Sequence, residues 1–423
     1  MMRTTLVETL VLFLCFFLGA LVCITSATYG RKQNYGDQVV VRCSNVSRVQ
    51  YQAISTQPGM DIWYISNNNI DVRVSWENVM WLRQLGIHCT ILHDSVEQLV
   101  KQFEKDLMVK QEWFEEYHEY DDIIKWYEEL ANRYTDIVTY YPSIGKSYEG
   151  RDMPAVHITG STAPNIFKIY FQCQIHAREW ISGAVCGYIV NYLLENYGNN
   201  DDVTKLLDSV EFIFIPFVNP DGYAYTWSND RLWRKNRRSG SPCDGVDLNR
   251  NYDEHWSEGG SSSNPCSETY HGTGPESEPE TQNTANYFRS NDVILGAIDW
   301  HSYSQLILRP YGWTSEDAPD EAQLKAIGDG MSDRIFAVHG KYYTSQKGIG
   351  LYPTSGTARD WFYSDNANVN NGDYRSAGYT LELRDTGQYG FLLPPDQIIP
   401  NGEEMVPAVM YFANTLLEDP IKK

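Results

Sequence analysis

Residues 166–197 read IFKIYFQCQIHAREWISGAVCGYIVNYLLENY, and this stretch decides the fold. Residues 166–173 are largely apolar, which is typical of a strand buried on both faces of a sheet. Residues 180–197 carry apolar side chains three and four positions apart, which predicts a helix. A strand that leads directly into a helix is the repeating unit of an α/β fold, and the chemistry of such folds lies in loops beyond the carboxyl ends of the strands.

The loop between this strand and helix contains His176 and Glu179, three residues apart. An imidazole and a carboxylate at that spacing can bind one divalent cation. A second His-x-x-Glu, at His255 and Glu258, lies beside glycines and serines, so we interpret it as a solvent-exposed coincidence. The third ligand is expected at another strand end, and His301 directly follows an apolar strand. Two histidines and one glutamate leave zinc with an open fourth position, as in catalytic rather than structural sites.

Glu382 is the candidate for a catalytic base. It lies inside the apolar strand expected at 378–383, where a carboxylate is costly to bury without a partner. Burial should raise its pKa toward the range that is useful in catalysis. The alternative is a structural ion pair between Glu382 and Arg384.

The pattern along the chain predicts two folding units, since 423 residues exceed the roughly 100–200 of one domain. The first unit should be a small α+β unit with strands at 38–42, 61–65, 70–74 and 88–92 and helices at 76–85 and from 96 onward. The second should be a layered α/β fold with further helices at 120–133 and 403–417 and further strands at 211–218, 293–299 and 378–383.

Composition excludes several classes of protein. Apolar residues make up 42% of the chain and charged residues 21%, which excludes a disordered chain and a multi-span membrane protein. The net charge is −21, so neither nucleic acid nor an anionic membrane is expected as a partner. The basic run at 231–238 could bind nucleic acid in isolation, but this overall charge opposes that reading.

The N-terminus predicts secretion. Arg3 precedes an apolar run at 10–24 and the small residues Thr25 to Ala27, which together are typical of a signal peptide spanning residues 1–27. The alternative, a single-pass anchor, requires a longer apolar run. An even number of cysteines remains after residue 27, which predicts disulfides in a secreted, extracellular protein: Cys43, Cys89, Cys173, Cys186, Cys243 and Cys266.

Six motifs resemble, in order, those of the zinc carboxypeptidases of the pancreatic A/B type. They are HAREWI at 176–181, NPDGY at 219–223, RLWRK at 231–235, DLNRN at 247–251, HSYSQ at 301–305 and ELRDTG at 382–387. The likeness covers the chain from about residue 112 to the end. The stretch IDVRV at 70–74 also resembles the activation domain of that family, and six ordered motifs are far more specific than any one of them.

The resemblance implies roles for individual residues. His176, Glu179 and His301 would hold one zinc ion, Glu382 would be the general base and acid, and Arg234 would polarise the scissile carbonyl. The residues expected to bind substrate are Arg178, Arg231, Asn249, Arg250, Tyr303, Tyr352, Arg359 and Phe391. Of these, Asn249 and Arg250 would bind the terminal carboxylate of the substrate, and Tyr352 would close over it. Asp247 would orient His176 from behind.

The resemblance also implies an architecture and a mode of regulation. A signal peptide (1–27) would precede a small activation domain with an antiparallel sheet and helices (28–110) and a catalytic domain with a mixed sheet layered between helices (111–423). We expect a monomeric zymogen that a trypsin-like protease activates near Lys101, Lys105 or Lys110. Cys173 would pair with Cys186 and Cys243 with Cys266, which leaves Cys43 and Cys89 as the residual pair.

Two departures from the family pattern bear on the substrate. The connection at 364–377 is longer than usual and is interpreted as a loop at the rim of the cleft. Arg359 stands at the base of the specificity pocket, where the family usually has a small, aliphatic or acidic residue. We therefore expect a preference for peptides that end in Glu or Asp, unless Arg359 turns aside to Asp360 and leaves an apolar pocket.

Two other functions remain as alternatives to a peptidase that removes single C-terminal residues. One is a binding protein on the same fold, which usually lacks a ligand or the base, whereas this chain keeps all of them. The other is a zinc amidohydrolase that acts on small acyl-amino acids. An activation domain and a signal peptide favour the peptidase over the amidohydrolase.

Overall fold

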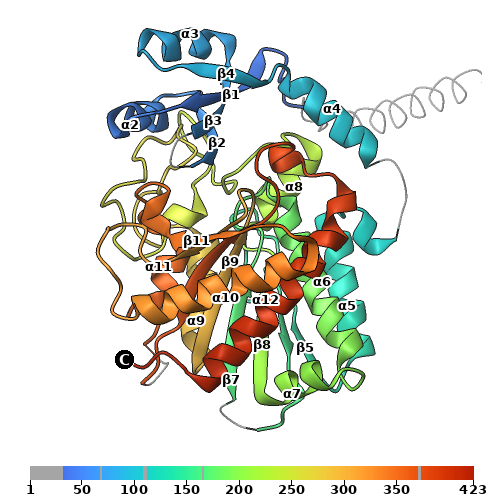
Figure 1. Ribbon diagram of the computed structural model, residues 1–423. Coiled ribbons are helices and arrows are strands. Elements are labelled where there is room, and N and C mark those ends of the chain that lie inside the picture. Colours follow the sequence, from blue (N-terminus) through green and yellow to red (C-terminus); the bar gives the residue numbers. More distant parts are fainter. Residues whose placement is uncertain (1–31, 67–68, 108–111, 164–165, 370–372) are drawn as a thin grey trace, which may run out of the picture.

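The computed structural model describes residues 32–66, 69–107, 112–163, 166–369 and 373–423. They form a small unit that lies over one end of a larger unit (Figure 1). The predicted signal peptide and Lys110 lie outside the described residues. Within the described ranges, no helix is both long enough and apolar enough to cross a membrane.

The small unit is an antiparallel sheet with helices, as predicted. Its elements are β1 (Gln38–Ser44), α2 (Arg48–Thr56), β2 (Asp61–Ile65), β3 (Asn69–Ser75), α3 (Trp76–Gln84), β4 (Cys89–His93) and α4 (Val96–Asp106). The strand order is β2-β3-β1-β4, and each pair is antiparallel. Ser75 begins α3 by accepting a hydrogen bond from the backbone N–H of Asn78, and Gly86 follows its end with φ 69°.

The large unit alternates strands and helices. It contains α5 (Tyr120–Arg133), β5 (Val138–Tyr141), β6 (Ala155–Ile158), β7 (Phe167–Gln172), α6 (Trp180–Asn196), α7 (Asp201–Ser209), β8 (Val210–Ile215), α8 (Pro220–Ser228), α9 (Pro279–Ser290), β9 (Ile294–His301), β10 (Leu306–Arg309), α10 (Glu321–His339), β11 (Thr344–Lys347), α11 (Ala358–Tyr363), β12 (Ala377–Glu382) and α12 (Ile398–Glu418).

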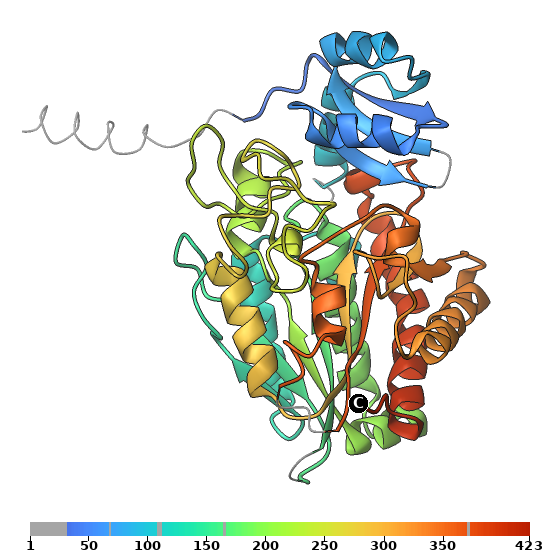
Figure 2. The ribbon, with the colours of Figure 1, turned by 90° about the vertical axis from the view of Figure 1, so that its left-hand side faces the viewer.

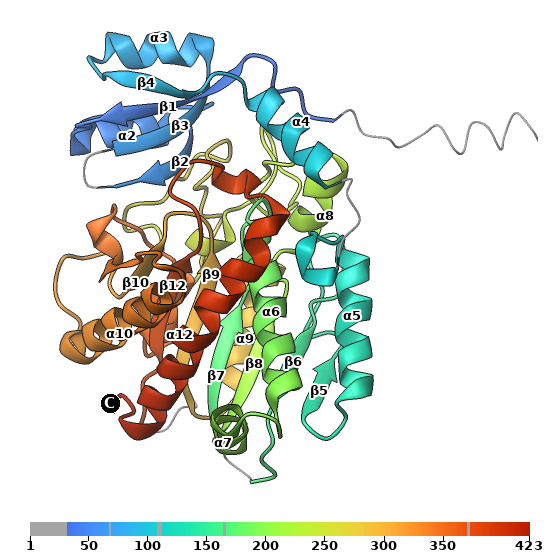
Figure 3. The same ribbon diagram turned by 45° about the vertical axis from the view of Figure 1, so that its right-hand side comes forward.

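Its eight strands form one mixed sheet in the order β11-β10-β12-β9-β7-β8-β6-β5. Strands β12, β9, β7 and β8 are parallel neighbours at its centre. On one side β10 is antiparallel to β12 and parallel to β11, and on the other β6 is antiparallel to both β8 and β5. Helices α5, α6, α7, α10 and α12 pack on one face, while α9 and α11 pack on the other (Figures 2 and 3). Both faces of the central strands are therefore buried, which explains their apolar sequences.

Because β7, β9 and β12 are parallel, their carboxyl ends meet at one edge of the sheet, which faces the small unit (Figure 3). His176 and Glu179 lie in the segment that follows β7, and His301 and Glu382 are the last residues of β9 and β12. The fold therefore gathers at one place the residues that the sequence places at separate strand ends.

Three disulfides are present in the described residues. Cys173–Cys186 joins the end of β7 to α6, and Cys243–Cys266 lies within the long connection between α8 and α9. Cys43–Cys89 joins β1 to β4, where the two cysteines are directly opposite one another. All three pairings agree with the predicted set.

The described residues of the connection at 364–377 do not lie at the rim of the cleft, contrary to our interpretation. The connection enters β12 at Ala377, which pairs with Gly296 near the start of β9, whereas Glu382 pairs with His301 at the other end. Tyr374 pairs instead with Lys422 near the C-terminus. The described part of this connection therefore lies at the edge of the sheet opposite the metal ligands.

Candidate active site

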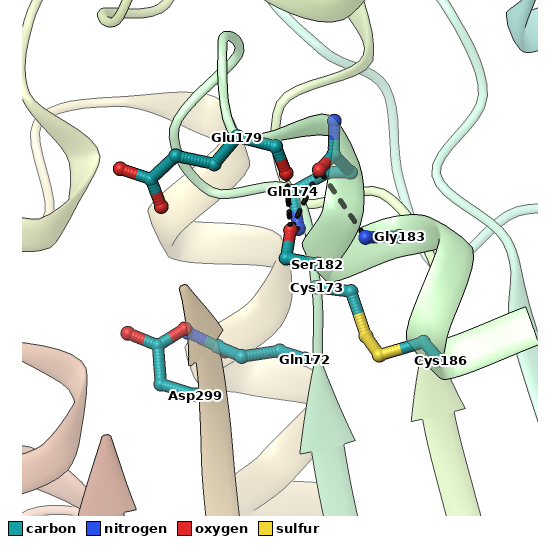
Figure 4. Close-up of a disulfide and its surroundings, with 8 residues drawn as sticks. All are labelled: Gln172, Cys173, Gln174, Glu179, Ser182, Gly183, Cys186 and Asp299. Atoms are coloured by element: carbon teal, nitrogen blue, oxygen red, sulfur yellow. Dashed lines mark hydrogen bonds between the residues drawn. A yellow bond between two sulfur atoms is a disulfide. The ribbon is translucent and has the colours of Figure 1, made fainter. Parts of the chain in front are cut away.

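Hydrogen bonds and a disulfide hold the turn that contains His176 and Glu179. The amide oxygen of Gln174 accepts from the Ser182 hydroxyl at 2.6 Å and from the Gly183 N–H at 3.3 Å (Figure 4). The same hydroxyl lies 2.9 Å from the backbone oxygen of Glu179, to which it can also donate. These contacts fix the first turn of α6 against the end of β7.

His176, Glu179 and His301 are buried and form one cluster, in which their ligand atoms all lie within 4.8 Å of one another. The Nδ1 atoms of the two histidines lie 2.9 Å from separate oxygens of the Glu179 carboxylate and 3.0 Å from each other. Two imidazole nitrogens and a carboxylate that face one point are a donor set that suits zinc. The three predicted ligands therefore fit a divalent metal ion.

Carboxylates orient both histidines from behind. Nε2 of His176 lies 3.0 Å from Asp247, and Nε2 of His301 lies 2.6 Å from Asp299. Asp299 is itself held by Gln172, whose amide donates to it at 3.0 Å (Figure 4). Such partners fix the tautomer and leave Nδ1 as the metal-binding atom. Asp247 was predicted for this position, whereas Asp299 was not, although it stands two residues before His301.

The charges in this cluster depend on one another. Burial opposes ionisation of Glu179, but His176 and His301 outweigh it and hold the pKa of the carboxyl well below its usual range. Burial also disfavours a charged His301, whereas Asp299 and Glu179 raise the pKa of this imidazole well above its usual value. The carboxylates of Glu179, Asp247 and Asp299 concentrate negative charge around the two histidines. A divalent cation bound there would neutralise this charge.

Glu382 is the last residue of β12 and pairs with His301 across the sheet. Burial raises the pKa of Glu382 to about 8; the negative charge of Glu179 acts in the same direction, and His301 and Arg234 oppose it. The alternative partner, Arg384, instead donates from Nε to Glu404 at 3.0 Å. Glu382 therefore does not form the structural ion pair with Arg384 that we considered.

Arg234 and the segment at 247–250 come from the long connection between α8 and α9. Arg234 donates to Asp247 at 2.9 and 3.3 Å, and its Nη1 lies 3.6 Å from Glu179. The amide nitrogen of Asn249 lies 3.1 Å from Nε2 of His301. Arg250 reaches the Tyr352 hydroxyl at 3.4 Å. Arg234 and Asn249 thus lie against the metal cluster, and Arg250 and Tyr352 line the same cavity as its ligands.

A cavity of about 90 Å³ adjoins the metal cluster. Most of the predicted site residues line it: His176, Glu179, Arg234, Asn249, Arg250, His301, Tyr303, Tyr352, Arg359, Glu382 and Phe391. Arg178 and Arg231 are not among its lining residues. The buried guanidinium groups of Arg250 and Arg359 and the raised-pKa carboxylate of Glu382 therefore line the same cavity as the potential metal ligands.

Comparisons with known proteins agree with this geometry. A sequence model of the family described as zinc carboxypeptidase matches residues 123–408. Carboxypeptidase B of Bos taurus is 33% identical over 424 residues, which cover 96% of this chain and 99% of that protein. This chain belongs to the zinc carboxypeptidase family. It is therefore a metallocarboxypeptidase, a hydrolase whose cofactor is zinc.

Two solved structures superpose on most of this chain. The crystal structure of thrombin activatable fibrinolysis inhibitor superposes with a TM-score of 0.79 at 32% identity, covering 90% of this chain and 100% of the other. The crystal structure of carboxypeptidase A from Helicoverpa armigera superposes with a TM-score of 0.82 at 27% identity, covering 92% and 99%. The arrangement of a small antiparallel unit over a mixed sheet is therefore that of the family.

Arg359 lies in the wall of the carboxypeptidase cavity, but it is not an isolated charge. Its Nε donates to Asp360 at 2.9 Å, and its Nη2 lies 3.3 Å from both Asp360 and the Thr354 hydroxyl. A Cβ at Gly348 would lie only 2.4 Å from the guanidinium carbon, so the glycine makes room for the arginine. None of the hydrogen bonds described in the structure uses Nη1 of Arg359.

The small unit of the carboxypeptidase covers the cavity with β2. Asp61 accepts from Arg178 at 2.7 and 2.9 Å, and both side chains are almost fully buried. Trp63 contacts the ring of Phe391, and Tyr64 stacks on Tyr303. The sequence analysis did not identify these contacts of Asp61, Trp63 and Tyr64. The sequence indicates them only through the two adjacent aromatic residues, Trp63 and Tyr64, on the strand expected at 61–65.

Proposed function

We propose that this chain is a secreted zymogen in which residues 28–110 block a C-terminal exopeptidase formed by residues 111–423, with a preference for acidic C-terminal residues. The observation that carries the zymogen proposal is the position of β2. Ile62, Trp63, Tyr64 and Ile65 line the same cavity as the metal ligands. A peptide cannot occupy that space while the strand is present.

Activation requires a cut between the two units. Lys101 and Lys105 are exposed on α4, immediately before the boundary. On the same helix, Phe103 is buried against the guanidinium of Arg231. A trypsin-like protease acting at these lysines would separate the units, and dissociation of β2 would then open the cavity.

Four side chains account for the choice of a C-terminal peptide bond. Arg250 and Asn249 would bind the terminal carboxylate, because a planar guanidinium can donate to both of its oxygens. Tyr352 adjoins Arg250 and would cover the bound residue. Arg234 would donate to the oxygen of the scissile carbonyl, where negative charge develops during the reaction. A substrate without a free C-terminus leaves Arg250 without its partner.

Zinc held by His176, Glu179 and His301 would supply a Lewis acid that polarises the carbonyl and acidifies water. Glu382 would accept a proton from water at its carboxylate and return it to the leaving amine. Its raised pKa suits a group that must both take and give a proton near neutral pH. Mutation of Glu382 to Gln removes this proton transfer and keeps the size of the side chain.

The acidic preference is supported by Arg359, whose Nη1 is free of hydrogen bonds to the described residues and whose guanidinium lines the cavity. Its pairing with Asp360 favours a second candidate, a pocket for aromatic or aliphatic residues. Thr354 and Thr357, which also line the cavity, can donate hydroxyl hydrogen bonds to a carboxylate. We therefore expect Glu and Asp to be preferred, with a moderate ratio because Asp360 already offsets the charge of Arg359.

Mass spectrometry of one peptide in free-acid and C-terminally amidated forms tests the exopeptidase. The trypsin-treated protein should remove a single residue from the free acid and leave the amide intact. The untreated protein should release far less. Cleavage of the amide, or equal activity before and after trypsin, would contradict the exopeptidase or the zymogen, respectively. Hydrolysis of acyl-amino acids in preference to peptides would favour the zinc amidohydrolase.

A further inference from the structure

A chain of hydrogen bonds runs behind His301 into the sheet. Gln172, the last residue of β7, is paired with Asp299 on the neighbouring parallel strand β9, and Figure 4 shows its side chain directed at Asp299. Because side chains alternate between the two faces of a strand, Asp299 and His301 lie on the same face of β9. The Gln172 amide donates to one oxygen of Asp299 at 3.0 Å, and the other oxygen lies 2.6 Å from Nε2 of His301. The strand pairing therefore places an amide and a carboxylate behind one metal ligand.

Tyr252 determines which way round the Gln172 amide lies. Its hydroxyl donates to the amide oxygen at 3.2 Å and also lies 3.1 Å from the hydroxyl of Thr284 on α9. An ionised carboxylate only accepts hydrogen bonds, so the amide presents its N–H to Asp299 and its oxygen to Tyr252. All four side chains are at most 1% exposed. Because bulk water does not reach them, a lost contact would leave a buried polar atom unsatisfied.

The carboxylates behind the two histidines differ in how their charge is balanced. Asp247 accepts two hydrogen bonds from the guanidinium of Arg234. Among the described residues, no lysine or arginine forms an ion pair with Asp299, which contacts His301 and one neutral amide. Its distance to the imidazole is also shorter, 2.6 Å against 3.0 Å for Asp247. The negative charge of Asp299 therefore acts mainly on His301, and a carboxylate in this position makes an imidazole a stronger metal ligand.

We infer that Gln172 and Tyr252 are positioning residues for zinc, which hold Asp299 against His301 and thereby set how tightly the metal is retained. Without the amide, Asp299 would keep an unsatisfied oxygen and would be free to turn away from Nε2, which would weaken His301 as a ligand. All of these contacts lie within the large unit. The inference therefore goes beyond the proposed function and does not depend on activation or on the preferred substrate.

The test measures the zinc dissociation constant of the intact chain by competition with a chromophoric chelator. Gln172→Leu removes the amide at similar size, and we expect the dissociation constant to rise about tenfold, within the range for groups that support zinc ligands. Tyr252→Phe removes one hydroxyl and should raise it about threefold. In cobalt-substituted protein, the visible absorption bands of Gln172→Leu should shift, because the orientation of one ligand changes.

Tyr170→Phe is the matched control. Tyr170 lies on β7 two residues before Gln172, and its buried hydroxyl has no hydrogen-bond partner among the described residues. Its loss should leave both the dissociation constant and the cobalt spectrum unchanged. A loss of zinc affinity in Tyr170→Phe equal to that in Tyr252→Phe would contradict the inference, because the effect would then follow from any change in this part of the core.

A double variant tests the path through Asp299. If Gln172 acts through Asp299, then Gln172→Leu should have little further effect on zinc affinity in protein that already carries Asp299→Asn. A tenfold loss that persists in full in that background would contradict this path. Unchanged zinc affinity in Gln172→Leu and Tyr252→Phe would contradict the inference as a whole. If Gln172→Leu does not fold, Tyr252→Phe, which lacks a single oxygen atom, provides the same comparison. None of these measurements requires peptidase activity, so their outcome is separate from that of the proposed function.

Discussion

Arg359 and Asp360 are neighbours in the chain and partners in space, since the Asp360 carboxylate accepts two hydrogen bonds from the guanidinium, at 2.9 and 3.3 Å. Asp360 also accepts from the backbone N–H of Gly312 at 2.8 Å. The cation in the pocket wall is therefore both positioned and largely neutralised. This relationship decides how strongly the pocket can discriminate between acidic and neutral side chains.

Replacing Asp360 with Asn should increase the preference for acidic substrates. The amide keeps a similar shape and removes the negative charge, so the guanidinium acts as a net cation. We expect the ratio of kcat/KM for Glu- over Leu-ending peptides to rise by about fivefold to tenfold, which is the net contribution of about one hydrogen bond. In Arg359→Ile, the same ratio should fall below that of the native enzyme. If the Glu-to-Leu ratio also rises in a double variant that carries both Asp360→Asn and Arg359→Ile, the effect does not depend on Arg359.

Replacing Asp61 with Asn should weaken the block in the uncut chain. The change breaks a buried ion pair and leaves Arg178 without its anion, which costs about 3–5 kcal/mol when one partner is removed. We expect uncut Asp61→Asn protein to hydrolyse peptides measurably faster than uncut native protein, while the two are equal after trypsin treatment. Lys101→Gln, which alters an exposed residue of α4, serves as a control with no expected rise in uncut activity. Equal uncut activity of Asp61→Asn and native protein would argue against a role for this ion pair in the block.

Replacing Glu382 with Gln should separate metal binding from turnover. Glu382 is not one of the three ligands, so zinc content measured by atomic absorption should stay near one ion per chain. Turnover should fall by at least about 100-fold, the usual contribution of general acid–base catalysis. A matched His301→Gln variant should lose zinc together with activity. Retention of full activity by Glu382→Gln would remove Glu382 from the mechanism.

Glu280 provides a test of stability against pH. Burial raises the pKa of its carboxyl to about 7, and hydrogen bonds from Tyr148 and Asn236 only partly offset this effect. Between its ordinary pKa and about pH 7, the folded state binds more protons than the unfolded state, so stability falls as pH rises through this window. The loss amounts to at most about 3 kcal/mol. Urea unfolding of Glu280→Gln should therefore show a smaller loss of stability than native protein between pH 5 and pH 8, and parallel losses would refute this assignment.

The metal cluster could be predicted from sequence because the direction and order of the strands determine where its residues lie. His176, Glu179 and His301 stand at the ends of apolar strands, and parallel strands bring their ends together. Glu382 could be identified from sequence because a carboxylate inside an apolar strand is costly to bury, which indicates a functional role or a partner. Asp299 was missed because a single acidic residue before a histidine carries no pattern of its own.

The contacts between the two units could not be predicted. Asp61 and Arg178 are 117 residues apart, and which side chains meet depends on how one folded surface packs against another. The orientation of Arg359 was left open for a similar reason. Whether its side chain points to Asp360 or into the pocket depends on how neighbouring residues such as Gly348 pack around it. The connection at 364–377 was misplaced because its length indicates a loop and does not indicate the edge of the sheet at which the loop lies.

A direct test of the central claim is the specificity of the trypsin-treated protein on five peptides that differ only in the last residue: Glu, Asp, Leu, Phe or Lys. The measurement is kcat/KM for release of that residue. The account predicts Glu as the best substrate and Lys as the worst, because a lysine ammonium would face Arg359 in a buried pocket. A higher kcat/KM for Phe or Leu than for Glu would contradict the acidic preference and would show that Asp360 leaves the pocket effectively neutral.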